Sequence, residues 1–221
     1  MAASLTQDHG HWITHLESLT REVLEVVPFG GSSEERAAYI DSFRDEFGNR
    51  RASDRPFLSH MLGVDMAALR EPEGMGLDER LWWSVAKGEP VPKGLIAPSD
   101  GLLTDPDALA IEYRTMVELG ALQAIWSAAM RDGDAALRAR AMDAACWHIE
   151  ELQPDNAINR PWGLPVFLEL SFSSVDKAIA QTAQLHAQTL LHNACINFGK
   201  PDLLSALILK NAVQLLSVSA Q

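Results

Sequence analysis

The chain of 221 residues contains only two cysteines, Cys146 and Cys195. Each of them lies among apolar residues at helical spacing, and a pair of this kind is not the framework that cross-links small secreted domains. We therefore expect two buried thiols and no disulfide, as in a protein of a reducing compartment.

Basic residues are also scarce. The chain has 18 Lys and Arg against 30 Asp and Glu, which gives a formal net charge of −12 at pH 7. A surface of this sign repels the phosphates of nucleic acids and the anionic headgroups of membranes. We expect neither nucleic acid nor a membrane as a partner.

The N-terminal residues lack the basic and apolar regions of a signal peptide, so we expect a cytoplasmic location. The stretch from Ala178 to Gly199 contains no Asp, Glu, Lys or Arg, but its glutamines, asparagines and histidines are too numerous for a lipid-facing span. We expect this uncharged segment to be a helix buried within the protein.

Local catalytic motifs are missing as well. The sequence has no phosphate-binding glycine loop, no GxSxG elbow and no paired CxxC. These absences exclude enzymes whose motifs are local in sequence, whereas an active site assembled from distant helices stays open.

The sequence does contain apolar residues at three-, four- and seven-residue spacings over most of its length. This pattern predicts an all-α fold in a single domain, residues 1–221, in which antiparallel helical hairpins pack as a bundle or α/α layer around a central uncharged helix, residues 174–198. The first two helices, within residues 4–27 and 32–47, are expected to form one such hairpin.

Two stretches interrupt this regularity. Residues 49–103 are rich in Pro and Gly, and we expect them to wrap across the outside with only short helices. Residues 164–172 alternate like a strand, but no partner strand is evident, so a short helix that starts near Pro165 is the better prediction.

The segment 153–163, QPDNAINRPWG, is the first candidate site, together with the end of the preceding helix and one residue of the uncharged helix. His148 could act as a general base if Glu151 or Asp155 oriented its ring, and Arg160 could hold an anionic group. The alternative is structural, because Asx residues form turns, Arg binds helix ends, and a His on an apolar stripe is commonly a core residue. The candidate ligand-binding residues are His148, Glu151, Asp155, Asn156, Arg160, Trp162 and His192.

A second candidate is the pair His11 and His15, which stand four residues apart as two metal-binding imidazoles on one helical face would. No third ligand at a matching spacing is evident, so the alternative is that both decorate the border of an exposed helix.

Three hypotheses for function follow. The leading one is a helical interaction or scaffold domain that binds a protein partner or a second copy of itself and needs no cofactor. The alternative is a small-molecule-binding protein or enzyme with a pocket between residues 153–163 and 174–198. The third is a metal-binding helical protein that uses His11 and His15. Whether the chain is an enzyme stays open.

Overall fold

All regular structure in the described residues is helical, as the apolar spacing predicts. The computed structural model describes residues 8–67, 69, 71, 73–92, 94–96, 101–104, 111–151 and 159–220. Its elements are α1 (His9–Thr20), the short 3-10 helix η1 (Val23–Val26), α2 (Ser33–Ser42), α3 (Asp54–Leu62), α4 (Leu77–Lys87), α5 (Ile111–Asp132), α6 (Ala135–Glu151), α7 (Leu164–Ser173), α8 (Lys177–Cys195) and α9 (Leu203–Ser219).

Helix starts follow from local capping. The Ser32 hydroxyl accepts a hydrogen bond from the N–H of Glu35, whose carboxylate accepts the N–H of Ser32, and this reciprocal pair begins α2. Asp8 and Asp202 cap α1 and α9 by a single bond, each accepting a backbone N–H of the first turn. Side chains adjacent in sequence therefore fix these boundaries.

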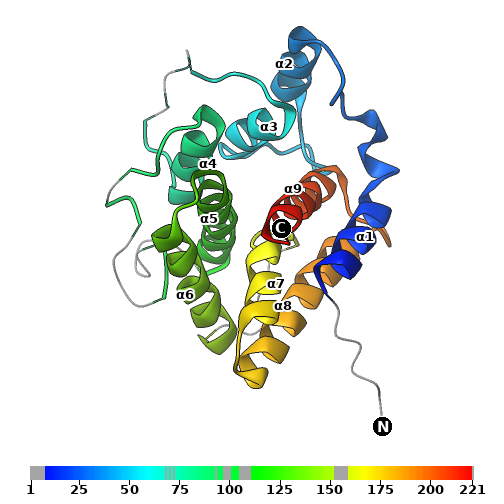
Figure 1. The fold of residues 1–221 in the computed structure, drawn as a ribbon. Coiled ribbons are helices and arrows are strands. Elements are labelled where there is room, and N and C mark those ends of the chain that lie inside the picture. Colours follow the sequence, from blue (N-terminus) through cyan, green and yellow to red (C-terminus); the bar gives the residue numbers. More distant parts are fainter. Residues whose placement is uncertain are drawn as a thin grey trace.

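The centre of the molecule is α7, which packs against α5, α6, α8 and α9 (Figure 1). The strand-like alternation of residues 164–172 is thus a helix that is buried on nearly all sides, as predicted from the lack of a partner strand. Helix α8, which carries no charged side chain after Lys177, is less central than its composition suggests. Ala183, Ala187 and Leu190 are buried against the neighbouring helices, but the side chain of Leu185 is 55% exposed.

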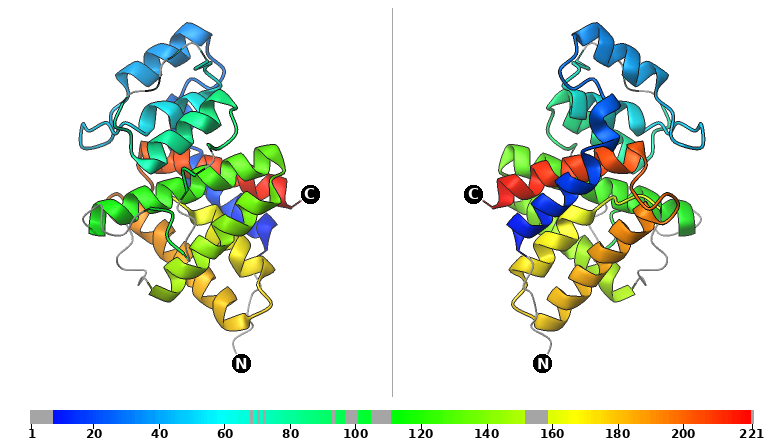
Figure 2. Two further views of the ribbon diagram at one scale, coloured as in Figure 1. Left: turned by 90° about the vertical axis from the view of Figure 1, so that its left-hand side faces the viewer. Right: turned by 90° about the vertical axis from the view of Figure 1, so that its right-hand side faces the viewer.

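The predicted hairpin of the first two helices does not form. Instead α1 packs along α9, and α2 packs on α3, as the two side views in Figure 2 show. Trp12, Leu16 and Thr20 of α1 are buried, whereas Ile40 is the one buried residue of α2. So narrow an apolar stripe gives α2 little surface with which to cover α1, and η1 and the loop after it lead the chain from α1 to α2, which packs on α3.

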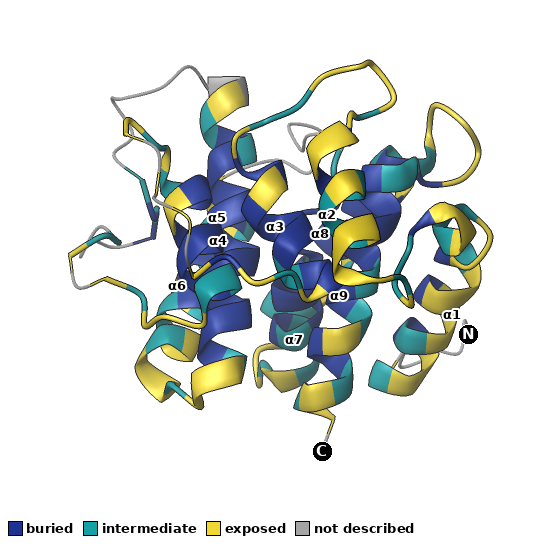
Figure 3. Cartoon of the chain, turned by 90° about the horizontal axis from the view of Figure 1, so that it is seen from above, coloured by how far each residue is buried: buried dark blue, intermediate teal, exposed yellow. Residues whose placement is uncertain are grey.

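The segment 49–103 was expected to wrap across the outside, but the two helices within it, α3 and α4, reach the core. The rings of Phe57, Trp82 and Trp162 meet with centroids 4.8 to 5.7 Å apart. In the view from above in Figure 3, dark blue buried residues run through α3, α4 and α5, and yellow exposed ones lie mainly on loops and outer turns. The Pro and Gly content marks the connections rather than the helices.

The long helix α5 continues without a break through Gly120, where a Cβ atom would lie 3.3 Å from the side chain of Asp78 on α4. The glycine therefore lets two helices approach closely. One turn later the buried amide of Gln123 donates to Asn211 of α9 and accepts the N–H of Gly163. This amide fixes the start of α7 against α5 and α9.

Candidate functional site

His148 is a buried residue of α6 and faces a carboxylate that the sequence did not single out. Its ring is 1% exposed, and its Nε2 atom lies 3.8 Å from Oε2 of Glu118 on α5. That distance suits an ion pair but exceeds a hydrogen bond. Neither ring nitrogen has a hydrogen-bond partner among the described residues. Of the two carboxylates suggested to orient this ring, Glu151 is exposed and Asp155 lies outside the described residues.

Glu118 holds the segment 101–104 onto the core. Its carboxylate accepts the N–H of Leu103 at 3.0 Å and both the N–H and the hydroxyl of Thr104. Burial alone would raise the pKa of Glu118, but His148 and these donors lower it below the usual value. From α6, Arg140 donates to the carbonyl of Leu102. The arrangement is that of a structural anchor between α5 and α6.

Arg160 links three carboxylates rather than facing an open pocket. Its guanidinium lies 2.6 Å from Asp202, 2.9 Å from Glu46 and 3.2 Å from Asp45. Burial alone would lower the pKa of Arg160, but these carboxylates raise it above the usual value. The side chain thus joins the N-terminus of α9 to the loop that follows α2.

The remaining loop candidates have other neighbours. Trp162 is 2% exposed and packs on Phe57 and Trp82, whereas Asp155 and Asn156 lie outside the described residues. His148, Arg160 and Trp162 therefore each belong to a different contact group. The described residues give each of them a structural role.

A different set of predicted residues does come together. His11 and His15 on α1 and His192 on α8 line one pocket of about 500 Å³, although the sequence suggested them for different reasons. Trp12, Leu19 and Leu191 give this pocket apolar walls. Gln188, Cys195 and Gly199 complete it.

We call this the histidine pocket, and none of its lining residues carries a formal charge when the imidazoles are neutral. The rings of His11 and His15 stack with centroids 6.3 Å apart. Burial, with the nearby charge of Asp202, raises the pKa of the Cys195 thiol, so the thiol is protonated near neutral pH. The pocket therefore offers neutral hydrogen-bonding groups on an apolar surface.

The metal hypothesis was that His11 and His15 bind an ion. In the described part of the chain, no three His, Cys, Asp or Glu side chains are placed so that they could hold a metal ion. Zinc sites in proteins usually take three or four protein ligands. The placed side chains thus supply no third ligand for this pair.

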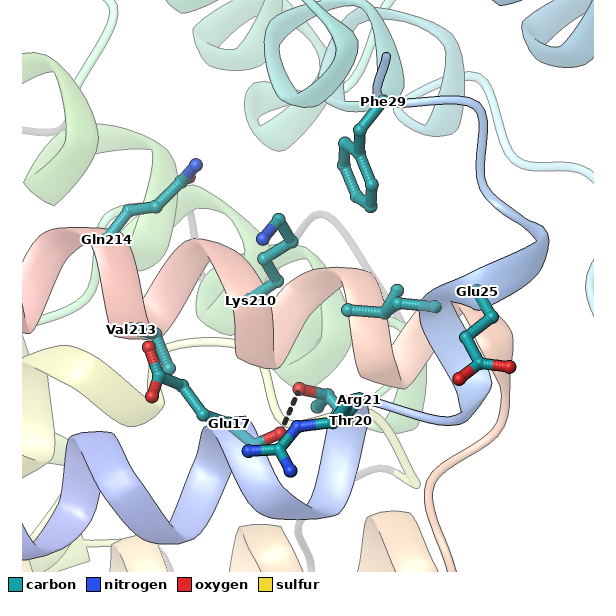
Figure 4. Close-up of a pocket in the computed structure, with 9 residues that line it drawn as sticks. Glu17, Thr20, Arg21, Glu25, Phe29, Lys210, Val213 and Gln214 are labelled. Carbon is teal, nitrogen blue, oxygen red and sulfur yellow. Dashed lines mark hydrogen bonds between the residues drawn. The ribbon is translucent and has the colours of Figure 1, made fainter. Parts of the chain in front are cut away.

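A second pocket, which we call the charged pocket, lies on the other side of α1, between α1, η1 and α9 (Figure 4). It measures about 340 Å³, and Leu24, Phe29 and Val213 give it an apolar surface. Its polar lining residues are Glu17, Thr20, Arg21, Glu25, Lys210 and Gln214.

Apart from the three histidines, few of the residues that form these sites were singled out by sequence patterns. Glu118 could have been noticed, because it is the one charged residue between Thr115 and Met130 of α5. Lys210 stands alone in the apolar run of α9 in the same way. A lone charge on an apolar helix is a usable signal, but its partner cannot be read from spacing.

No known protein family matches the chain, and no curated protein or solved structure is significantly similar to it. Among the described residues, no helix has both the length and the apolar character needed to cross a membrane. Any functional proposal must therefore rest on the geometry of the pockets.

Proposed function

We propose that the protein binds a small uncharged molecule in the histidine pocket between α1 and α8. The observation that carries this proposal is the meeting of His11, His15 and His192 in one hollow. Binding sites for small molecules combine mainly apolar walls with a few placed polar groups, and cavities of about 300–1,000 Å³ are typical. The histidine pocket has this composition, and its volume of about 500 Å³ lies in this range.

The chemistry of the pocket suggests the class of ligand. Neutral imidazoles can each donate and accept one hydrogen bond, and the Gln188 amide can do both. Trp12 provides a flat aromatic wall. A planar heteroaromatic molecule with its own donors and acceptors would satisfy these groups without bringing a charge into the pocket.

The test is a thermal-shift screen of uncharged heteroaromatic fragments against the protein and two tryptophan variants. Gln188→Trp fills the pocket from an exposed position on α8. Gln181→Trp places the same bulk at an exposed position two turns earlier, outside the residues that line the pocket. Fragments that raise the melting temperature of the parent and of Gln181→Trp, but not of Gln188→Trp, support the proposal.

Cysteine alkylation gives a second readout. A bound fragment should slow the reaction of Cys195 with N-ethylmaleimide and leave Cys146 on α6 unaffected, because Cys195 alone of the two lines the pocket. Equal stabilisation of both tryptophan variants, or no protection of Cys195, would contradict the proposal. Zinc chloride in the same screen tests the metal hypothesis, which requires a stabilisation that His11→Ala removes.

Self-association is a second candidate function. It corresponds to the hypothesis from the sequence that the chain binds a second copy of itself. It is favoured by the exposed apolar side chains of Leu185, Ile196 and Phe198, which are 55%, 59% and 58% exposed on or next to the uncharged helix. Exposed apolar side chains that gather on one face are a common feature of protein interfaces. Light scattering over a range of protein concentrations measures whether the chain associates.

A further inference from the structure

The charged pocket is separate from the histidine pocket and lies across α1 from it. Its floor is α9, α1 borders one side and η1 another, and Phe29 reaches toward α9 from the loop that follows η1 (Figure 4). Leu24 and Val213 add further apolar surface to the pocket. At about 340 Å³ the pocket is at the small end of the range for ligand sites.

Four charged side chains line this pocket, and they are not paired with one another. Glu17, Arg21, Glu25 and Lys210 form no ion pair within the part of the chain that the structure describes. Glu17 and Arg21 stand four residues apart on α1, in the order that favours pairing on a helix. Figure 4 shows that the Glu17 carboxylate instead extends toward Val213 on α9.

Lys210 has the most distinctive surroundings of the four. It is only partly exposed, and its ammonium lies 4.8 Å from the centre of the Phe29 ring. This cation–π contact holds the ammonium at the apolar end of the pocket and provides no carboxylate. A ligand that places an anionic group there would gain a charge-assisted hydrogen bond next to an aromatic surface.

A ligand with one charge fits this lining poorly. A simple anion would approach Lys210 and Arg21 but would also meet Glu17, Glu25 and the net charge of −12. A simple cation would meet the opposite problem. A molecule with both an ammonium and a carboxylate, together with an apolar group for Phe29, Leu24 and Val213, suits both signs of charge and the apolar surface of this pocket.

We propose that the charged pocket binds an amino acid with an apolar side chain, in its zwitterionic form. The ligand carboxylate pairs with Lys210, its ammonium lies near Glu17, and its apolar side group packs on Phe29. This site does not depend on the histidine pocket, since the two share no lining residue.

The experiment is isothermal titration calorimetry with phenylalanine and two analogues that each lack one charge, 3-phenylpropionate and phenethylamine. Phenylalanine should bind, and each analogue should bind at least about tenfold more weakly, since each leaves one charged group of the pocket unpaired. Leucine and methionine are titrated alongside, because the apolar side group is not fixed by the pocket.

Lys210→Met should weaken zwitterion binding at least about tenfold, because it removes the charge and keeps the aliphatic bulk. Lys177→Met is the matched control, since Lys177 is exposed on α8 and does not line the pocket. If circular dichroism shows that Lys210→Met does not fold, Glu17→Gln is used as the second variant, because Glu17 is exposed.

Three results would overturn the proposal: no binding of any of the three amino acids, equal binding of 3-phenylpropionate and phenylalanine, or equal weakening by Lys177→Met. Phenylalanine should also leave the alkylation rate of Cys195 unchanged. That readout separates the two pockets, so that failure of either proposal is visible without the other.

Discussion

A carboxylate withdrawn from water is stable as an anion only if hydrogen-bond donors replace the water it has lost. Glu118 is fully buried, and the donors are the N–H groups of Leu103 and Thr104 and the Thr104 hydroxyl. His148 adds an imidazole at 3.8 Å from the same carboxylate. Through these contacts, the stability of the fold depends on the protonation state of Glu118.

We predict that Glu118→Gln lowers the free energy of unfolding at pH 7 by about 2 kcal/mol, because the amide NH2 would face backbone N–H groups. The folded-state pKa of Glu118 lies below the unfolded value of 4.5. Its stabilising contribution is therefore complete above pH 4.5 and is lost as the pH falls through the folded-state pKa. Chemical denaturation at several pH values should show the difference between variant and parent shrinking in acid.

The control is Glu151→Gln on α6, which removes an exposed carboxylate and should change stability little. A pH-independent difference for Glu118→Gln would contradict the prediction. The sequence indicated that His148 belongs to an apolar stripe, but the partners it suggested for the ring were Glu151 and Asp155. The true partner is 30 positions earlier in the chain, on another helix, and no local spacing encodes that contact.

At the scale of helices and loops, Arg160 joins elements that are far apart in the sequence. Its guanidinium contacts Asp45 and Glu46 after α2 and the Asp202 cap of α9. All four side chains are largely buried, with at most 16% of any of them exposed. Removing a single cation from such a group leaves several carboxylates without a counterion.

We predict that Arg160→Met lowers the free energy of unfolding by about 3 kcal/mol, in line with the loss of one partner from a buried ion pair. Urea denaturation at pH 7 measures the loss. Arg55→Met should cost less than about 1 kcal/mol, because Arg55 and Asp41 form an exposed pair. Equal effects of the two substitutions would show that the Arg160 contacts do not stabilise the fold.

At this scale, sequence patterns predict where a helix lies but not which helices it packs against. Capping residues and apolar periodicity are local, so the start of α7, predicted near Pro165, lies close to its observed position at Leu164. Packing partners are not local. The pairing of α1 with α9, and the histidine pocket formed by residues about 180 positions apart, depend on the whole fold.

At the scale of the whole molecule, the charge distribution limits how two copies can meet. Each chain carries a formal net charge of −12, so most of its surface repels a second copy. The run from Ala178 to Gly199 contains no charged side chain, and it carries the exposed residues Leu185, Ile196 and Phe198. If the chain self-associates, this face is where like-charge repulsion is least and apolar burial is greatest.

We predict association that strengthens as salt rises from about 0.05 to about 0.5 M, because screening weakens the repulsion between acidic surfaces while apolar burial persists. Sedimentation equilibrium at both salt concentrations measures it. Phe198→Glu should abolish the association, since it places an anion in the uncharged face. Phe47→Glu is the matched control, because Phe47 is 64% exposed on the loop after α2, away from α8. A chain that stays monomeric in both salts, or that responds equally to the two substitutions, does not associate through α8.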